Sequence, residues 1–221
     1  MNRKSSSAAA PRSRPLVVGV LGGIACGKSA VAGLLAGPDG RVLSADALAS
    51  EELASPDGVR FLRQRFGNAL LDAQGRPNRS ALAELVFGPD RGTEALRALE
   101  GWIHPRVRAR IMERLGEARA AAVPIVVLDV PLLLENDESH GLARACDALV
   151  FVECGEAERE SRARASRGWP RGEIRRREAV QLALALKRAR ADHVLENQGN
   201  LDDLGRAARE LRQRLLQGRV P

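Results

Sequence analysis

The segment Gly22–Ser29 reads G-G-I-A-C-G-K-S and directly follows the apolar run Leu16–Leu21. Glycines near both ends allow the backbone to curl, so that successive N–H groups point inward at an anion. The lysine brings a positive charge to the outer phosphates of a nucleotide, and the serine hydroxyl is a ligand for Mg²⁺. The spacing G-x-x-x-x-G-K-[ST] therefore predicts a P-loop that binds a nucleotide.

We expect this loop to bind ATP, and we predict contacts from the residues Gly23, Ile24, Ala25, Cys26, Gly27, Lys28, Ser29 and Ala30. Lys28 is predicted to take part in catalysis, and Ser29 in binding Mg²⁺. A thiol near a helix N-terminus and a lysine has a lowered pKa, so Cys26 is either redox-sensitive or, as we favour, a small residue whose N–H binds phosphate. The motif alone fits a kinase, an ATPase or a GTPase.

Three carboxylates follow apolar runs. Phosphoryl transfer to a hydroxyl needs a carboxylate that orients the hydroxyl and accepts its proton. Asp46 is our catalytic candidate for this role, and capping of the helix Ala47–Leu53 is the equal alternative. Asp129 ends a strand-like run and is predicted to bind Mg²⁺ with Ser29; the alternative is a loop carboxylate. Glu135 is a third candidate.

Eight arginines crowd into a short stretch that contains few acids: Arg159, Arg162, Arg164, Arg167, Arg171, Arg175, Arg176 and Arg177. Small-molecule kinases cover the phosphates with an arginine-bearing lid. We predict such a lid at about 160–180, with Arg177 in catalysis together with Arg162 or Arg164. Half or more of these arginines are expected to form a solvated face. An RNA-binding strip would need a single helical stripe, whereas these residues spread around the helix.

Five short apolar runs are predicted to be strands: Leu16–Leu21, Arg41–Ser44, Ile125–Asp129, Ala148–Val152 and His193–Glu196. Helical patterns separate them, which indicates an α/β fold with a doubly wound parallel sheet. We expect the P-loop kinase core to comprise 16–54 and 124–221, with a helical insertion at 55–123. The first 15 residues are predicted to be a disordered tail, with a transit peptide as the alternative.

Helices are predicted over Ser29–Leu35, Ala47–Leu53, Val59–Phe66, Ser80–Phe87, Thr93–Ile103, Val107–Ala122, Gly155–Ser166, Gly172–Arg190 and Asp202–Leu216. The gap around Pro105 reflects the missing N–H of proline, which disfavours a helix interior.

Composition narrows the partners. The formal charge is +7 and aromatic residues make up 3% of the 221 residues, with no Tyr. A basic protein without stacking platforms suits phosphorylated small molecules better than nucleic acid. Cys26, Cys146 and Cys154 show no metal or disulfide spacing, which suits a reducing cytoplasm. No apolar run approaches the roughly 20 residues of a membrane helix, so no membrane partner is expected.

Seven segments, in order, carry a resemblance to a known family: Gly22–Ser29, Val42–Ala49, Asn78–Phe87, Ile103–Pro105, Asp129–Glu135, Arg177–Gln181 and Lys187–Asn197. Together they resemble the dephospho-CoA kinase family, over nearly the whole chain beyond the tail. The departures are Ala25 and Cys26 for Gly and Ser in the loop, Leu134 for Phe, and Ser44 where the family's first Asp of D-A-D is usual. Ser44 puts the metal shell in question.

The resemblance implies transfer of the γ-phosphoryl of ATP to the 3′-hydroxyl of dephospho-CoA in the cytoplasm, by a monomer or weak homo-oligomer. It places Arg79 and His104 on the substrate side and makes 55–123 the CoA-binding part. A packing or capping role for His104, and an exposed first helical turn for Arg79, are the alternatives. Two other functions stay open: another small-molecule P-loop kinase, and a nucleotide-gated or RNA-binding module. The chain offers no guanine-reading N-K-x-D after a strand.

Overall fold

A computed structural model describes residues 14–87 and 94–218 of the chain, apart from the side chains of Phe87 and Ser139. The predicted tail therefore lies almost entirely outside the described residues. Within the described part, none of the helices combines the length and apolar character that crossing a bilayer requires.

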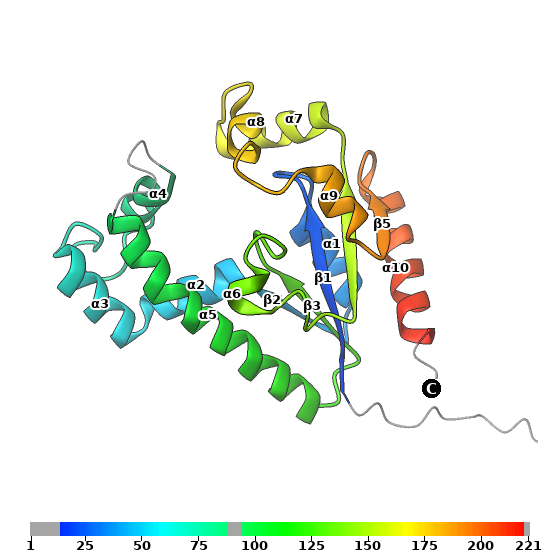
Figure 1. The fold of residues 1–221 in the computed structure, drawn as a ribbon, viewed down its shortest axis with the longest axis horizontal. Helices are drawn as coiled ribbons and strands as arrows, with labels where there is room; N and C mark the ends of the chain where they lie inside the picture. The colour runs from blue at the N-terminus through cyan, green and yellow to red at the C-terminus, as the bar shows by residue number, and fades with distance from the viewer. Residues whose placement is uncertain (1–13, 88–93, 219–221) are drawn as a thin grey trace, which may run out of the picture.

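The core is one parallel sheet of five strands in the order β2-β3-β1-β4-β5 (Figure 1). The strands are β1 (Leu16–Gly22), β2 (Arg41–Ser44), β3 (Ile125–Asp129), β4 (Ala148–Glu153) and β5 (His193–Glu196). All seven residues of β1 are buried, as expected for a central strand covered on both faces. The strand order reverses beside β1, which confirms the predicted doubly wound fold.

Helices cover both faces of the sheet, and alternate strand residues point to each. On one face, Val18 and Val20 of β1 pack in a cluster with α1 (Lys28–Ala36) and α10 (Leu201–Gln217). On the other face, Val17 and Leu21 pack in a cluster with α5 (Glu94–Ala120). The remaining helices are α2 (Ala45–Ala54), α3 (Pro56–Phe66), α4 (Arg79–Phe87), α6 (Asp137–His140), α7 (Glu156–Arg167), α8 (Glu173–Glu178) and α9 (Leu184–Ala189).

Helix α5 is continuous through Pro105, so the prediction of two helices separated there was wrong. A proline inside a helix removes one backbone hydrogen bond. In this helix the loss is offset by packing on both sides of the proline, because Leu99, Ile103 and Val107 are all buried. Tertiary burial of an apolar face contributes more to a helix than local propensity does.

The single helix predicted over Gly172–Arg190 was also wrong, since α8 and α9 are separate. The chain leaves helical geometry between them, where the N–H of Leu182 donates to Glu135 Oε1 at 3.2 Å. A side chain from after β3 thus satisfies a backbone donor that a continuous helix would have used internally.

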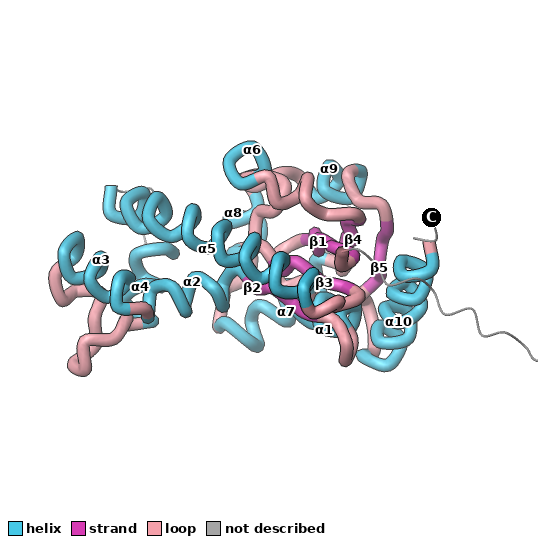
Figure 2. Tube along the Cα trace, turned by 90° about the horizontal axis from the view of Figure 1, so that it is seen from below, coloured by secondary structure: helices cyan, strands magenta, loops and turns pink. Residues whose placement is uncertain are grey.

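Helices α3 and α4 and the first half of α5 project away from the sheet (Figures 1 and 2). This part has its own small apolar cluster, built around Leu62, Leu70, Leu71 and Leu99. Phe61 stacks on Trp102 with ring centroids 4.7 Å apart, which ties α3 to α5. Because α5 also packs on the sheet, it joins the projecting part rigidly to the core.

We predict that Leu62→Ala lowers the free energy of unfolding by about 2–5 kcal/mol, because Leu62 is fully buried and the neighbours cannot fill the cavity. The matched control is Leu201→Ala, which makes the same change where the side chain is 76% exposed and should cost less than about 0.5 kcal/mol. Urea unfolding measures both. Equal losses in the two variants would contradict the packing described for α3.

Candidate active site

The predicted P-loop runs from the carboxyl end of β1 to the first turn of α1. Its curl depends on three residues with positive φ, namely Gly22 (149°), Ala25 (59°) and Gly27 (90°). Gly27 is the N-cap of α1, so the backbone amides after it are the unpaired donors of a helix N-terminus. Such a turn concentrates N–H groups and partial positive charge on an anion.

Side chains of the motif stay close to the loop. Lys28 Nζ donates to the carbonyl oxygens of Gly23 at 2.8 Å and Gly22 at 3.3 Å, so its charge lies over the turn. Cys26 is fully buried and packs in the cluster beneath α1. This burial favours the interpretation of Cys26 as a small packing residue over a redox-sensitive one.

Ser29 and Asp129 lie together, as the sequence predicted. The Ser29 hydroxyl donates to Asp129 Oδ2 at 2.6 Å, which joins the start of α1 to the end of β3. A hydroxyl and a carboxylate are hard oxygen ligands, and they fit Mg²⁺. Within residues 14–87 and 94–218, no group of three or more His, Cys, Asp or Glu side chains could hold a metal ion. Kinases usually hold Mg²⁺ through one or two carboxylates together with substrate phosphates.

Asp46 stands in the first turn of α2, beside β2 and β3. The N-cap of this helix is Ser44, whose hydroxyl accepts the N–H of Ala47 at 3.3 Å, so capping by Asp46 is wrong. The residue that departs from the usual D-A-D pattern thus has a structural task. The Asp46 carboxylate is therefore not used as the helix cap, and Asp46 lies near the edge of the sheet where Asp129 ends β3.

The electrostatic neighbours of Asp46 come from three elements. Loss of solvent raises the pKa of its carboxyl, and the negative charge of Asp129 raises it further. The charges of Arg167 and Lys28 act in the opposite direction. The strand register gives the same placement, because Ser44, two residues before Asp46, pairs with Asp129, and Asp129 accepts the hydroxyl of Ser29 at the start of α1. A raised pKa makes this carboxylate a better proton acceptor than an ordinary Asp.

Two side chains that the sequence analysis did not select form hydrogen bonds with the backbone of the P-loop. Asn197, just after β5, donates from Nδ2 to the carbonyl oxygen of Cys26 at 2.8 Å. Glu178, at the end of α8, accepts the N–H of Ile24 at 2.7 Å. A Cβ on Gly27 would lie 2.4 Å from Asn197 Nδ2, so glycine is required there by space as well as by φ. Both residues belong to segments that carry the family resemblance, Asn197 to Lys187–Asn197 and Glu178 to Arg177–Gln181, although neither was selected as a site residue.

The arginine-rich lid region consists of α7, α8 and the turn between them. Arg177 forms an ion pair with Glu173 at 2.6 Å and lies 4.1 Å above the ring of Trp169. Arg167 lies over the same ring at 4.8 Å, and its charge reaches Asp46. Arg162 Nη2 contacts Asn197 at 3.4 Å. Arg167 and Arg162 are thus two of the lid arginines that the structure links to the site, and the predicted role of Arg177 stays a prediction.

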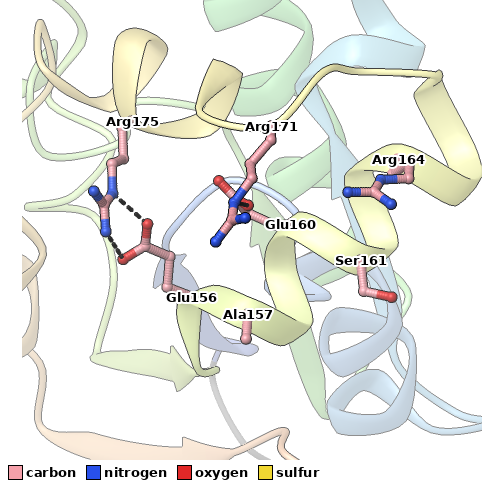
Figure 3. A pocket seen from close by; sticks show the side chains of 7 residues that line it. All are labelled: Glu156, Ala157, Glu160, Ser161, Arg164, Arg171 and Arg175. Carbon is pink, nitrogen blue, oxygen red and sulfur yellow. Dashed lines mark hydrogen bonds and ion pairs between the residues drawn. The ribbon is translucent and has the colours of Figure 1, made fainter.

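Other arginines border a hollow of about 520 Å³ between α7 and α8 (Figure 3). It is lined by Glu156, Ala157, Glu160, Ser161, Arg164, Arg171 and Arg175. Arg175 pairs with Glu156, and Arg171 lies 3.9 Å from Glu160. Of the two alternatives named from the sequence, Arg164 therefore borders this hollow and Arg162 adjoins the P-loop.

The predicted substrate residues lie on the side of the projecting helices. Arg79 is exposed at the start of α4. His104 is exposed in the middle of α5, so the capping alternative is wrong. The pKa of His140 is lowered, first by loss of solvent and then by the positive charges of His104 and Arg108, against the effect of Asp137.

Glu135 has a structural role. Its Oε1 lies 2.7 Å from Lys187 Nζ, and this pair is almost fully enclosed, with side-chain exposures of 16% and 5%. The same oxygen accepts the N–H of Leu182. Breaking such a pair leaves an uncompensated buried charge. Glu135 thus joins the segment after β3 to α9.

Comparisons with known proteins identify the family of this chain. The family model for dephospho-CoA kinase matches residues 16–203. A dephospho-CoA kinase of Rhodopirellula baltica is 34% identical over 93% of this chain and 94% of its own length. One of Thermus thermophilus is 39% identical over 87% of this chain and 88% of its own. The chain belongs to the dephospho-CoA kinase family.

Solved structures support the same fold. The crystal structure of TT1252 from Thermus thermophilus matches with a TM-score of 0.69 and 38% identity, and covers 90% of this chain and 96% of that one. A dephospho-CoA kinase from Campylobacter jejuni matches with a TM-score of 0.64 over 90% and 96%, at 21% identity. At that identity the second match speaks for the fold alone. The two matches therefore support the α/β fold described above.

We predict that Asp129→Asn lowers the pKa of Asp46. The substitution removes the negative charge that helps to raise this pKa, while Lys28 and Arg167 keep their opposing effect. The titration of the Asp46 carboxyl carbon, followed by NMR without Mg²⁺ or nucleotide, measures the shift. Asp57→Asn, in the first turn of α3, serves as the control and should leave the pKa unchanged. If the titration of Asp46 is unaltered in Asp129→Asn, the charge of Asp129 does not act on Asp46 and the prediction is wrong.

Proposed function

We propose that this protein transfers the γ-phosphoryl group of ATP to the 3′-hydroxyl of dephospho-CoA, the last step of coenzyme A synthesis. The observation that carries the proposal is the convergence of the P-loop lysine, Asp129 and a carboxylate of raised pKa, Asp46, at one edge of the sheet. Membership of the dephospho-CoA kinase family supports the choice of acceptor.

In the proposed reaction, the loop amides and Lys28 bind the β- and γ-phosphates of ATP. Asp46 orients the ribose 3′-hydroxyl and accepts its proton as the oxygen attacks the γ-phosphorus. The new O–P bond forms while the bond between the γ-phosphorus and the β–γ bridging oxygen breaks. ADP leaves, and the acceptor, now phosphorylated on its 3′-oxygen, is coenzyme A. Mg²⁺, when bound, neutralises charge on the phosphate oxygens, and Ser29 and Asp129 are the residues proposed to hold it.

The lid and the projecting helices complete the proposal. Arg167 and Arg162, with Arg177, are proposed to approach the phosphates when the lid covers them and excludes water. Residues 55–123, including Arg79 and His104, are proposed to bind the CoA portion. The division into a core of 16–54 and 124–221 and this insertion remains a prediction, as do the cytoplasmic location and the monomeric or weakly oligomeric state.

The proposed function is tested by incubating the purified protein with ATP, Mg²⁺ and one acceptor at a time, and by separating the products chromatographically. We expect ADP and a phosphorylated product with dephospho-CoA, and only background hydrolysis with AMP or gluconate. These two acceptors represent the alternative kinase functions. Transfer to either of them, without transfer to dephospho-CoA, would overturn the choice of acceptor while keeping the kinase.

We predict that Asp46→Asn keeps ATP affinity and lowers kcat about a hundredfold or more, since an isosteric amide cannot accept the proton. Lys28→Ala is the contrasting variant and should weaken ATP binding and turnover together. Steady-state kinetics and direct nucleotide binding separate the two effects. Near-normal turnover of Asp46→Asn would remove this carboxylate from the mechanism.

A further inference from the structure

Arg159 is a charged residue placed inside the protein, although it stands in the arginine-rich segment where solvated side chains were expected. It is 4% exposed, and among the described residues only Lys187 and Asn197 are other polar or charged residues buried to this degree. Its Nη1 lies 2.6 Å from Glu178 Oε1. A buried ion pair is by itself a weak source of stability, so its location needs another reason.

The Arg159–Glu178 pair forms hydrogen bonds with both backbone groups of one P-loop residue, Ile24. Glu178 Oε1 accepts the N–H of Ile24 at 2.7 Å, and Arg159 Nη1 donates to the carbonyl oxygen of Ile24 at 3.4 Å. Arg159 comes from α7 and Glu178 from α8. Both lid helices thus meet at a single residue of the loop.

The loop is shaped to receive this pair. A Cβ on Gly23 would lie 2.6 Å from Arg159 Nη1 and 2.9 Å from Glu178 Oε1. Glycine at position 23 therefore leaves the space that the two charged groups occupy. The φ of Gly23 is not in the left-handed region, so close approach is what glycine serves at this position.

The residue after Ile24 is strained. Ala25 has φ of 59°, a conformation that residues with a side chain rarely adopt. Such a conformation persists only where its surroundings determine it. The contacts on Ile24 fix the peptide groups on both sides of that residue, and so fix how the chain enters Ala25.

We propose that Arg159 and Glu178 are positioning residues, which hold Ile24 so that the following amides of the P-loop face the phosphates of a nucleotide. The inference rests on the proposed use of this loop for ATP. It concerns ATP binding alone, so that it stands or falls independently of the acceptor.

The test measures ATP affinity by calorimetry in Glu178→Ala and in Glu156→Ala. Glu156 makes the matched control, because its ion pair with Arg175 also joins α7 to α8. Within the described part of the chain, neither Glu156 nor Arg175 hydrogen-bonds or ion-pairs with the P-loop. We expect Glu178→Ala to raise the Kd for ATP about tenfold or more, and Glu156→Ala to leave it within twofold. If the control weakens ATP binding equally, or if neither variant does, the proposal is wrong.

Glu178→Ala leaves the charge of Arg159 buried without its partner, so folding is checked by circular dichroism, and the double variant Arg159→Ala with Glu178→Ala removes that charge. The double variant should bind ATP as weakly as the single one. Gly23→Ala should weaken ATP binding in the natural chain, and should add nothing in the double variant, where the space is free. If the pair served general stability alone, the variants would unfold at a lower temperature, the Kd for ATP would be unchanged, and no non-additivity with Gly23→Ala would be seen.

Discussion

The P-loop can direct its backbone amides at an anion only if the surrounding structure holds it in a conformation that is unfavourable for the isolated chain. Between Gly22 and Lys28 the chain passes through three positive φ angles, one of them at an alanine. No regular hydrogen-bonding pattern supports such a turn, so its carbonyl and amide groups find partners elsewhere. Asn197, just after β5, supplies one of them, and α7 and α8 supply others. The site is therefore built by side chains that never need to contact the substrate.

The same edge of the sheet concentrates charge of both signs. Parallel strands end together there, so Asp129 and the start of α2 lie close to the start of α1. Loss of solvent raises the pKa of Asp46, and the nearby negative charge of Asp129 raises it further. Lys28 and Arg167 limit this effect. The strands behind this edge are well buried, since all of β1 and every residue of β3 except Asp129 lie in the interior.

Much of this arrangement could be predicted from the sequence. Apolar runs separated by helical patterns predicted the five strands. One eight-residue motif predicted the P-loop, because phosphate binding by such a loop depends on the local spacing of its residues. The break between α8 and α9 could not be predicted, since it depends on Glu135, which is distant in sequence. The continuity of α5 through Pro105 depends on two apolar clusters that form only in the folded chain. Arg159 and Glu178 looked like members of a solvated charge run, because burial is set by tertiary contacts.

The position of β1 in the sheet has a consequence for how the chain folds. β1 pairs Leu16 with Ile125 and Val18 with Ala148, partners more than a hundred residues away. During synthesis the first strand therefore has no hydrogen-bonded neighbour until more than half of the chain has been made, and long-range parallel pairing is slow. Asn197 is later still. The phosphate loop, although encoded near the start, is among the last parts to reach its final form.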